Sequence, residues 1–228
     1  AFSYVIRPTN SISILLIAFY VLVRYPKRFI SFCLWGCTVA LPFLMHNLAV
    51  YDGILPLYYL PGRITGSSHV WEALVGNLIS PSRGLLVFSP VLAYAIYGAA
   101  LRLRYRLFGL SSFLVIAVLL HWVAISLFPH WYGGYSIGPR FFTDVVPYLV
   151  YLLVPAITVL RCPQSARQRA LRLCLLVTGL ISVAIHGWCS VSVQPYRWND
   201  VPVSVDRCPD RVWDWKDPQF LRGLGPAR

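Results

Sequence analysis

Two short segments hold the residues best suited to chemistry, and each lies beside a long apolar run. The first, SPSRGLLVFSP, covers residues 80–90. Its SPSRG portion is a turn sequence that can cap the start of a helix, and free N–H groups at a helix N-terminus beside Arg83 would bind a phosphate. The alternative is that Arg83 only anchors a membrane helix at the interface. Both interpretations stay open at this point.

The second segment, HWYGGYSIGPRFFTD at residues 130–144, combines glycines with aromatic rings. Its glycines would let the backbone approach a ligand closely. Its rings could stack on the face of a sugar, or they could form the aromatic belt of a membrane interface. The histidine of this loop is better placed for a substrate than the histidines within the apolar runs. The candidate substrate contacts are His130, Trp131, Tyr132 and Tyr135.

Arg140 lies near the end of the same segment and is the side chain that we most readily assign to an anionic headgroup. Asp144 follows it at a spacing that places two residues on one face of a helix. We therefore predict that Arg140 and Asp144 pair at the start of a helix, with Asp144 in a structural role. The alternative is that the whole segment is an aromatic belt with a structural ion pair.

The six cysteines do not have the spacing of a metal site. Cys33 and Cys37 share a helix face, but no third or fourth ligand is near them in the sequence. We therefore predict no metal and no cofactor. Cys189 and Cys208 both fall on the predicted outer side, where a disulfide between them is an alternative to two free thiols. The carboxylates do not form a pair suited to acid–base catalysis.

The elements that must position these segments are strongly apolar. Hydrophobic residues make up 57% of the chain and charged residues only 12%, whereas soluble domains carry roughly 25% charged residues. The apolar runs are about 17 to 23 residues long, which is the length that crosses a bilayer. We predict an all-α integral membrane protein with about six transmembrane helices, and not a soluble enzyme. The predicted spans are residues 9–23, 29–50, 84–101, 107–128, 145–160 and 171–193.

Two further elements complete the predicted architecture. Residues 70–79 (VWEALVGNLI) have the pattern of an amphipathic helix that lies along the outer interface. Residues 194–228 form a polar, Trp-rich extracytoplasmic tail, which we predict to be an ordered cover over the outer face. The chain then divides into a transmembrane domain at residues 1–193 and this carboxy-terminal tail.

The distribution of charge orients the predicted spans. Basic residues gather in the links at residues 24–28, 102–106 and 161–172, which hold no acid, and all eight acids fall on the other side. The positive-inside rule places these links in the cytoplasm. Because the net charge of +12 follows this membrane pattern without a nucleic-acid-binding motif, we exclude nucleic acid as a partner. The first span then begins outside, which leads us to expect an odd number of further spans upstream.

Three motifs together resemble a known family. YVIRPTN at residues 4–10, SPSRGLLVFSP at residues 80–90 and WYGGYSIGPRFFTDVVPYL at residues 131–149 resemble bacterial polytopic proteins of the GT-C glycosyltransferase superfamily, in particular protein mannosyltransferase-like members. The resemblance implies an enzyme of the bacterial cytoplasmic membrane that uses a polyprenyl-phosphate sugar at the outer face. It also implies a catalytic acid in the first outer loop. That region is absent here, so the chain would be the carboxy-terminal part.

Two functional hypotheses follow. In the first, the chain is part of a membrane glycosyltransferase, in which Arg83 and Arg140 clamp the leaving phosphate and the aromatic side chains of residues 131–135 contact the sugar or the prenyl chain. In the second, it is a non-catalytic scaffold subunit of a larger membrane complex, respiratory or photosynthetic. Its partners would be membrane lipids with a polyprenyl-phosphate sugar and an upstream catalytic half, or other membrane subunits. A transporter is a weaker hypothesis, because no acid or lysine lies at mid-depth in the spans.

Overall fold

The computed structural model describes residues 2–54, 69–105 and 107–224. Arg106 and residues 55–68, which precede the predicted amphipathic helix at 70–79, lie outside the described residues. Within the described part every regular element is helical, which confirms the predicted all-α class. The α-helices are α1 (Phe2–Ile6), α2 (Ser11–Arg24), α3 (Pro26–Tyr51), α5 (Val70–Ile79), α6 (Leu85–Phe88), α7 (Ala93–Tyr105), α8 (Leu110–Ser126), α9 (Val146–Arg161), α10 (Ala166–Val191) and α11 (Gln194–Arg197). The 3-10 helices are η1 (Pro8–Asn10), η3 (Pro90–Leu92), η4 (Arg140–Val145), η5 (Pro209–Trp213) and η6 (Gln219–Leu221).

Three helical segments are long and apolar enough to cross a membrane. They are Pro26–Tyr51, Arg140–Arg161 and Ala166–Val191, and they coincide with three of the predicted spans. A hydrocarbon core of about 30 Å needs roughly 20 helical residues, which each of these segments supplies. The predicted spans at 9–23 and 107–128 are also helical, but Pro8–Arg24 and Leu110–Ser126 are shorter apolar helices.

The predicted span at 84–101 is not a continuous helix. Helix α6 ends at Phe88, Ser89 has φ −134° and ψ 65°, and η3 begins at Pro90 before α7 continues. Proline lacks the N–H that the preceding turn would bond, and its ring pushes the residue before it out of the α-helical region. The helix in the predicted span is therefore broken, and the reason is local to the Ser-Pro sequence.

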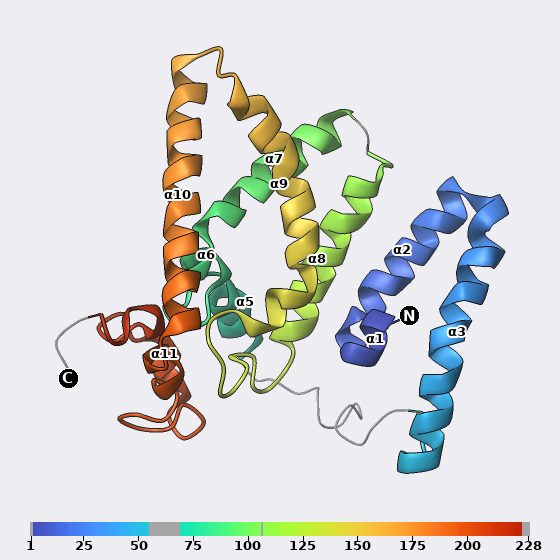
Figure 1. The fold of residues 1–228 in the computed structure, drawn as a ribbon, viewed down its shortest axis with the longest axis horizontal. Helices are drawn as coiled ribbons and strands as arrows, with labels where there is room; N and C mark the ends of the chain where they lie inside the picture. Colours follow the sequence, from blue (N-terminus) through green and yellow to red (C-terminus); the bar gives the residue numbers. More distant parts are fainter. Residues whose placement is uncertain (1, 55–68, 106, 225–228) are drawn as a thin grey trace.

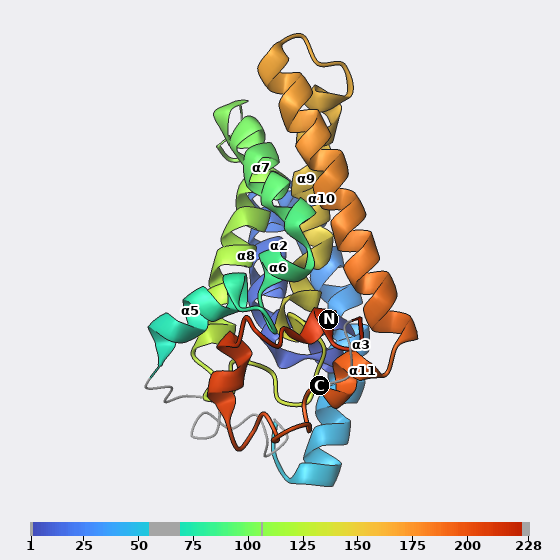
Figure 2. The same ribbon diagram turned by 90° about the vertical axis from the view of Figure 1, so that its left-hand side faces the viewer.

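The helices are arranged so that the basic links gather at one end (Figure 1). The links between α2 and α3, α7 and α8, and α9 and α10 lie at the upper end of Figure 1, whereas α5, α11 and the tail lie at the lower end. Figure 2 shows the same separation from the side, with α5 and the tail far from the α9–α10 link. The structure thus places the tail, which holds five of the eight acids, and the acid-free basic links at opposite ends of the molecule.

Two groups of buried side chains form the core. The first joins α7, α8 and α9, and includes Ala95, Ala99, Ile125 and Leu152. The second lies at the lower end and joins α5, the loop after α8 and the tail, through Ala73, Trp131, Tyr132, Trp198, Val205 and Val212. Helix α3, in contrast, leaves Ile30, Trp35 and Met45 at least 70% exposed. Such an apolar face is compatible with contact to lipid.

The contact between α7 and α9 depends on small residues. Gly98 lies in α7, and a Cβ added there would clash with the backbone carbonyl oxygen of Leu152 in α9. Small residues let helix backbones approach closely, which is the main way that membrane helices pack.

We expect Gly98→Ala to lower the free energy of unfolding by roughly 1–3 kcal/mol, the usual penalty for overpacking, because the clash is with backbone and α9 must shift. Denaturant unfolding of the protein in detergent micelles measures this change. The matched control is Gly36→Ala in α3, where an added Cβ meets no atom within 4 Å. An equal response of both variants would contradict the close α7–α9 packing.

Candidate functional site

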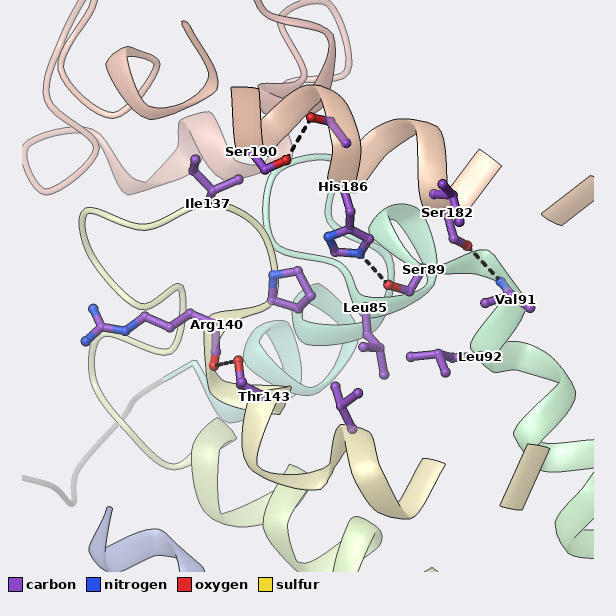
Figure 3. Close-up of a pocket in the computed structure, with 14 residues that line it drawn as sticks. Leu85, Ser89, Val91, Leu92, Ile137, Arg140, Thr143, Ser182, His186 and Ser190 are labelled. Atoms are coloured by element: carbon purple, nitrogen blue, oxygen red, sulfur yellow. Dashed lines mark hydrogen bonds between the residues drawn. The ribbon is translucent and has the colours of Figure 1, made fainter. Parts of the chain in front are cut away.

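One candidate site is a groove among the helices (Figure 3). Its volume is about 850 Å³, and it lies between the broken helix α6–η3, the start of η4 and the last turns of α10. The lining residues come from three segments far apart in sequence, at 85–92, 137–146 and 182–190. Ligand sites in proteins commonly have volumes of about 300–1,000 Å³. The groove is therefore large enough for part of a lipid-linked ligand.

The walls of the groove are mostly aliphatic. Their apolar members include Leu85, Val91, Leu92, Ile137, Val146 and Val183. No acidic side chain is among the residues that line it in the described structure. Such walls suit an alkyl or isoprenoid chain, because an apolar chain loses no hydrogen bonds on entering them.

The polar groups released by the helix break bond to α10. The backbone N–H of Val91 donates to Ser182 Oγ at 3.3 Å, and the Ser182 hydroxyl donates to the Thr178 carbonyl oxygen at 2.7 Å. Ser89 Oγ lies 2.8 Å from His186 Nε2, and this pair forms the polar part of the groove wall (Figure 3). In a membrane, non-helical backbone must be satisfied by protein or by water. Ser182 meets that requirement for the Val91 N–H, and His186, one turn further along α10, pairs with the Ser89 side chain.

Arg140 lies at the edge of the groove and its side chain is exposed. Its guanidinium forms no hydrogen bond or ion pair with a described residue, and it is the only arginine or lysine among the groove-lining residues of the described structure. Figure 3 shows its side chain extending away from the Ser89–His186 pair. The backbone is held separately, because the Arg140 carbonyl oxygen accepts hydrogen bonds from Thr143 Oγ1 at 2.7 Å and from Arg7 Nη1 at 3.2 Å.

The predicted pair between Arg140 and Asp144 is wrong. The Asp144 carboxylate instead accepts from Arg7 Nη1 at 3.4 Å and from Thr9 Oγ1 at 3.1 Å. Residues 140–145 form the 3-10 helix η4, and a 3-10 helix has three residues per turn, so positions four apart do not share a face. Asp144 thus connects η4 to the amino-terminal segment and leaves the Arg140 guanidinium uncompensated.

Arg83 occupies a different environment from Arg140. It is 1% exposed, although its charge is retained. Its Nε donates to the Tyr132 carbonyl oxygen at 2.6 Å. Its Nη1 donates to the Ser82 carbonyl oxygen at 2.9 Å and to Gln219 Oε1 at 2.6 Å. Its Nη2 donates to the Gly134 carbonyl oxygen at 3.0 Å and to Asn199 Oδ1 at 2.7 Å. These bonds use all of the N–H donors of a guanidinium.

All five acceptors around Arg83 are neutral, so no carboxylate bonds directly to the guanidinium. Burial lowers the pKa of Arg83 to about 9, which still leaves it protonated at neutral pH. The geometry favours a structural role for Arg83 and leaves no N–H directed to a phosphate. The substrate-binding role stays a prediction. Sequence reasoning missed this environment because Asn199 and Gln219 are more than a hundred residues away in the chain.

The predicted aromatic contacts lie mostly against the tail. Trp131 and Tyr132 are buried in the second core group, and Tyr132 Oη donates to Asp206 Oδ1 at 3.2 Å. Burial and then the Asp206 charge raise the pKa of Tyr132 to about 12, so the phenol stays a donor at neutral pH. Tyr135 Oη donates to Asp200 Oδ1 at 2.7 Å and lies 2.8 Å from Ser204 Oγ. His130 is exposed, with Nδ1 at 3.1 Å from Tyr132 Oη.

The cysteines and possible metal ligands add no site. Cys189 and Cys208 are both free, so the disulfide considered from the sequence is not formed. Across the described ranges, no group of His, Cys, Asp and Glu side chains is placed to hold a metal ion. A comparison with protein-family models, curated proteins and solved structures finds no match to this chain. The functional argument therefore depends on the residues themselves.

We expect replacement of the two arginines by alanine to have very different effects on the free energy of unfolding. We expect Arg83→Ala to lower the free energy of unfolding by about 3–5 kcal/mol, because it leaves several buried acceptors without donors. Arg140→Ala, at an exposed position where the guanidinium bonds to no described residue, should change it by less than about 0.5 kcal/mol. Denaturant unfolding in detergent, followed by tryptophan fluorescence, measures both. Similar stability of the two variants would contradict the buried network around Arg83.

Proposed function

We propose that this chain is part of a multi-spanning membrane glycosyltransferase-like protein that binds a polyprenyl-phosphate-linked sugar at the outer face of the bacterial cytoplasmic membrane. The observation that carries the proposal is the apolar groove with an uncompensated arginine at its edge. The groove would hold the first part of the prenyl chain. Arg140 would bind the phosphate, whose negative charge increases as the sugar leaves.

The orientation of the chain is part of the same proposal. All six predicted spans would cross the bilayer, including the broken helix α6–η3–α7, with the basic links in the cytoplasm. The support is that the links with Arg24, Arg104 and Arg161 lie at one end of the helices and the tail at the other (Figure 1). The groove then opens near the outer interface, where a lipid phosphate would be found.

The base that accepts the proton of the attacking hydroxyl is not assigned to this groove, since no acid lines it in the described structure. The family resemblance implies that an acid of the first outer loop supplies this base. In this proposal the chain provides the donor-lipid site, and the reaction needs that further acid to be brought next to it.

The alternative function is a non-catalytic scaffold subunit. It is favoured by the observation that Arg83, Trp131 and Tyr132, all predicted to contact substrate, pack or bond within the chain itself. The apolar exposed face of α3 would then contact a partner helix. Binding of a prenyl phosphate distinguishes the two functions, because a scaffold has no need of a specific lipid.

We expect Arg140→Ala to weaken binding of undecaprenyl phosphate by at least about tenfold, the loss of one charge-assisted contact. In the full-length protein the same change should abolish sugar transfer while leaving folding intact. Titration of the purified protein in phosphatidylcholine nanodiscs measures the affinity. The matched control is Arg104→Ala. Arg104 lies at the end of α7 that is far from the groove, so this variant should bind as the parent does. Unchanged affinity in Arg140→Ala would argue against the donor-lipid site and for the scaffold.

The orientation can be tested with two native cysteines. Cys162 lies in the α9–α10 link and Cys208 in the tail, and both are exposed. In variants that keep only one of them, a membrane-impermeant maleimide should label Cys208 in intact cells, and Cys162 only after the membrane is permeabilised. The opposite pattern would reverse the proposed orientation.

A further inference from the structure

Gln219 is a buried polar side chain of the tail with an unusually complete set of partners. It is 0% exposed. Its Oε1 accepts from Arg83 Nη1 at 2.6 Å and from the backbone N–H of Gly138 at 3.0 Å. Its Nε2 donates to the carbonyl oxygens of Ser136 at 2.8 Å and Pro195 at 2.9 Å. A neutral amide is the side chain that can accept and donate at one position, so this environment is specific for glutamine.

The loop between α8 and η4 takes its backbone conformation from side chains of other segments. Arg83 binds the carbonyl oxygens of Tyr132 and Gly134. Asn199, which is also buried, donates to the Ser136 carbonyl oxygen at 3.1 Å, the same atom that Gln219 binds. Four backbone groups of the loop thus bond to side chains outside it: two carbonyl oxygens to Arg83, and the Ser136 carbonyl oxygen and the Gly138 N–H to the tail.

The turn at Gly138 connects Gln219 to the groove. Gly138 has φ +61°, and a Cβ there would lie 2.8 Å from the ring of Phe88. Its N–H is bound by Gln219, while its carbonyl oxygen accepts the N–H of Arg140 at 2.9 Å. Ile137, Pro139 and Arg140 on either side of this turn line the groove. One residue, Gly138, therefore links the tail to the arginine at the groove edge.

We propose that Gln219 is a positioning residue for the lipid-phosphate site: by holding the Gly138 turn, it keeps Arg140 at the edge of the groove. The tail is then a functional part of the site although none of its residues lines the groove in the described structure. This inference rests on the proposed function, since it assigns a positioning role to a site whose ligand is the prenyl phosphate.

The test separates positioning from stability with two substitutions at one residue. Gln219→Glu keeps an acceptor for Arg83 and Gly138 but cannot donate to Ser136 and Pro195, whereas Gln219→Leu removes all four bonds. Leu221→Ala, at a half-exposed position of the same 3-10 helix, is the matched control. Affinity for undecaprenyl phosphate is measured in phosphatidylcholine nanodiscs, together with hydrogen exchange of the backbone at residues 137–140.

We expect Gln219→Leu to speed exchange at residues 137–140 and to weaken binding by about tenfold, with Gln219→Glu in between and Leu221→Ala unchanged. Because Gln219 acts through Arg140, the double variant Gln219→Leu/Arg140→Ala should bind no more weakly than Arg140→Ala alone, which is the non-additivity of coupled residues. A general loss of structure would instead add to the effect of Arg140→Ala.

Each other outcome is decisive. If Arg140→Ala weakens binding but both Gln219 variants bind as the parent does, the positioning role is overturned and the proposed function stands. If the losses in the double variant multiply, Gln219 acts independently of Arg140, and the inference is again wrong. Should Gln219→Leu fail to fold, Gln219→Glu still tests it through the bond to the Ser136 carbonyl oxygen that it loses, and parental affinity together with unchanged exchange across residues 137–140 in that variant would overturn it. If no variant, including Arg140→Ala, alters binding, the proposed function itself fails.

Discussion

The lower half of this molecule depends on the burial of one charged side chain. A guanidinium removed from water is tolerated only if each N–H finds an acceptor, since an unsatisfied buried donor costs about 1–3 kcal/mol and more for a charged group. Arg83 meets this requirement by donating hydrogen bonds to carbonyl oxygens of the loop after α8 and to the side-chain oxygens of Asn199 and Gln219. The turn before α6, the loop and the tail must therefore come together, and their aromatic side chains, Trp131 and Trp198 among them, complete the second core group.

A second constraint shapes the groove. Pro90 interrupts the helix after Ser89. The Val91 N–H then bonds to Ser182 of α10, and Ser89 Oγ pairs with His186 Nε2. The break leaves one helix in two parts beside α10, and the loop held by the tail covers the adjacent side. The groove is thus a consequence of two local features, a proline and a buried arginine, which lie only seven residues apart in the sequence. Arg140 remains exposed because Asp144 bonds to Arg7 and Thr9 instead.

Much of the architecture could be predicted because helix position and membrane character depend on local composition. Apolar runs of helical length and clustered basic links are visible without any contact between distant residues. The sequence-based prediction differs from the structure at two places, and in both a local backbone feature interrupts the regular α-helix that was expected. The Arg140–Asp144 pair assumed an α-helical spacing in a segment that is a 3-10 helix, and the span at 84–101 was drawn through a Ser-Pro pair that breaks the helix.

The sequence by itself determined the helical class, the apolar helices and the separation of the acid-free basic links from the segments that hold the acids, since these follow from residue type within each segment. It also singled out Arg83 and Arg140 from their motifs. Only the tertiary structure decided that one is buried among neutral acceptors and the other exposed at a groove. The physical reason is that each motif holds a single arginine, and nothing local to either motif fixes whether that arginine is buried. Their difference comes from Asn199, Gln219, Arg7 and Thr9, which approach them only when distant segments pack.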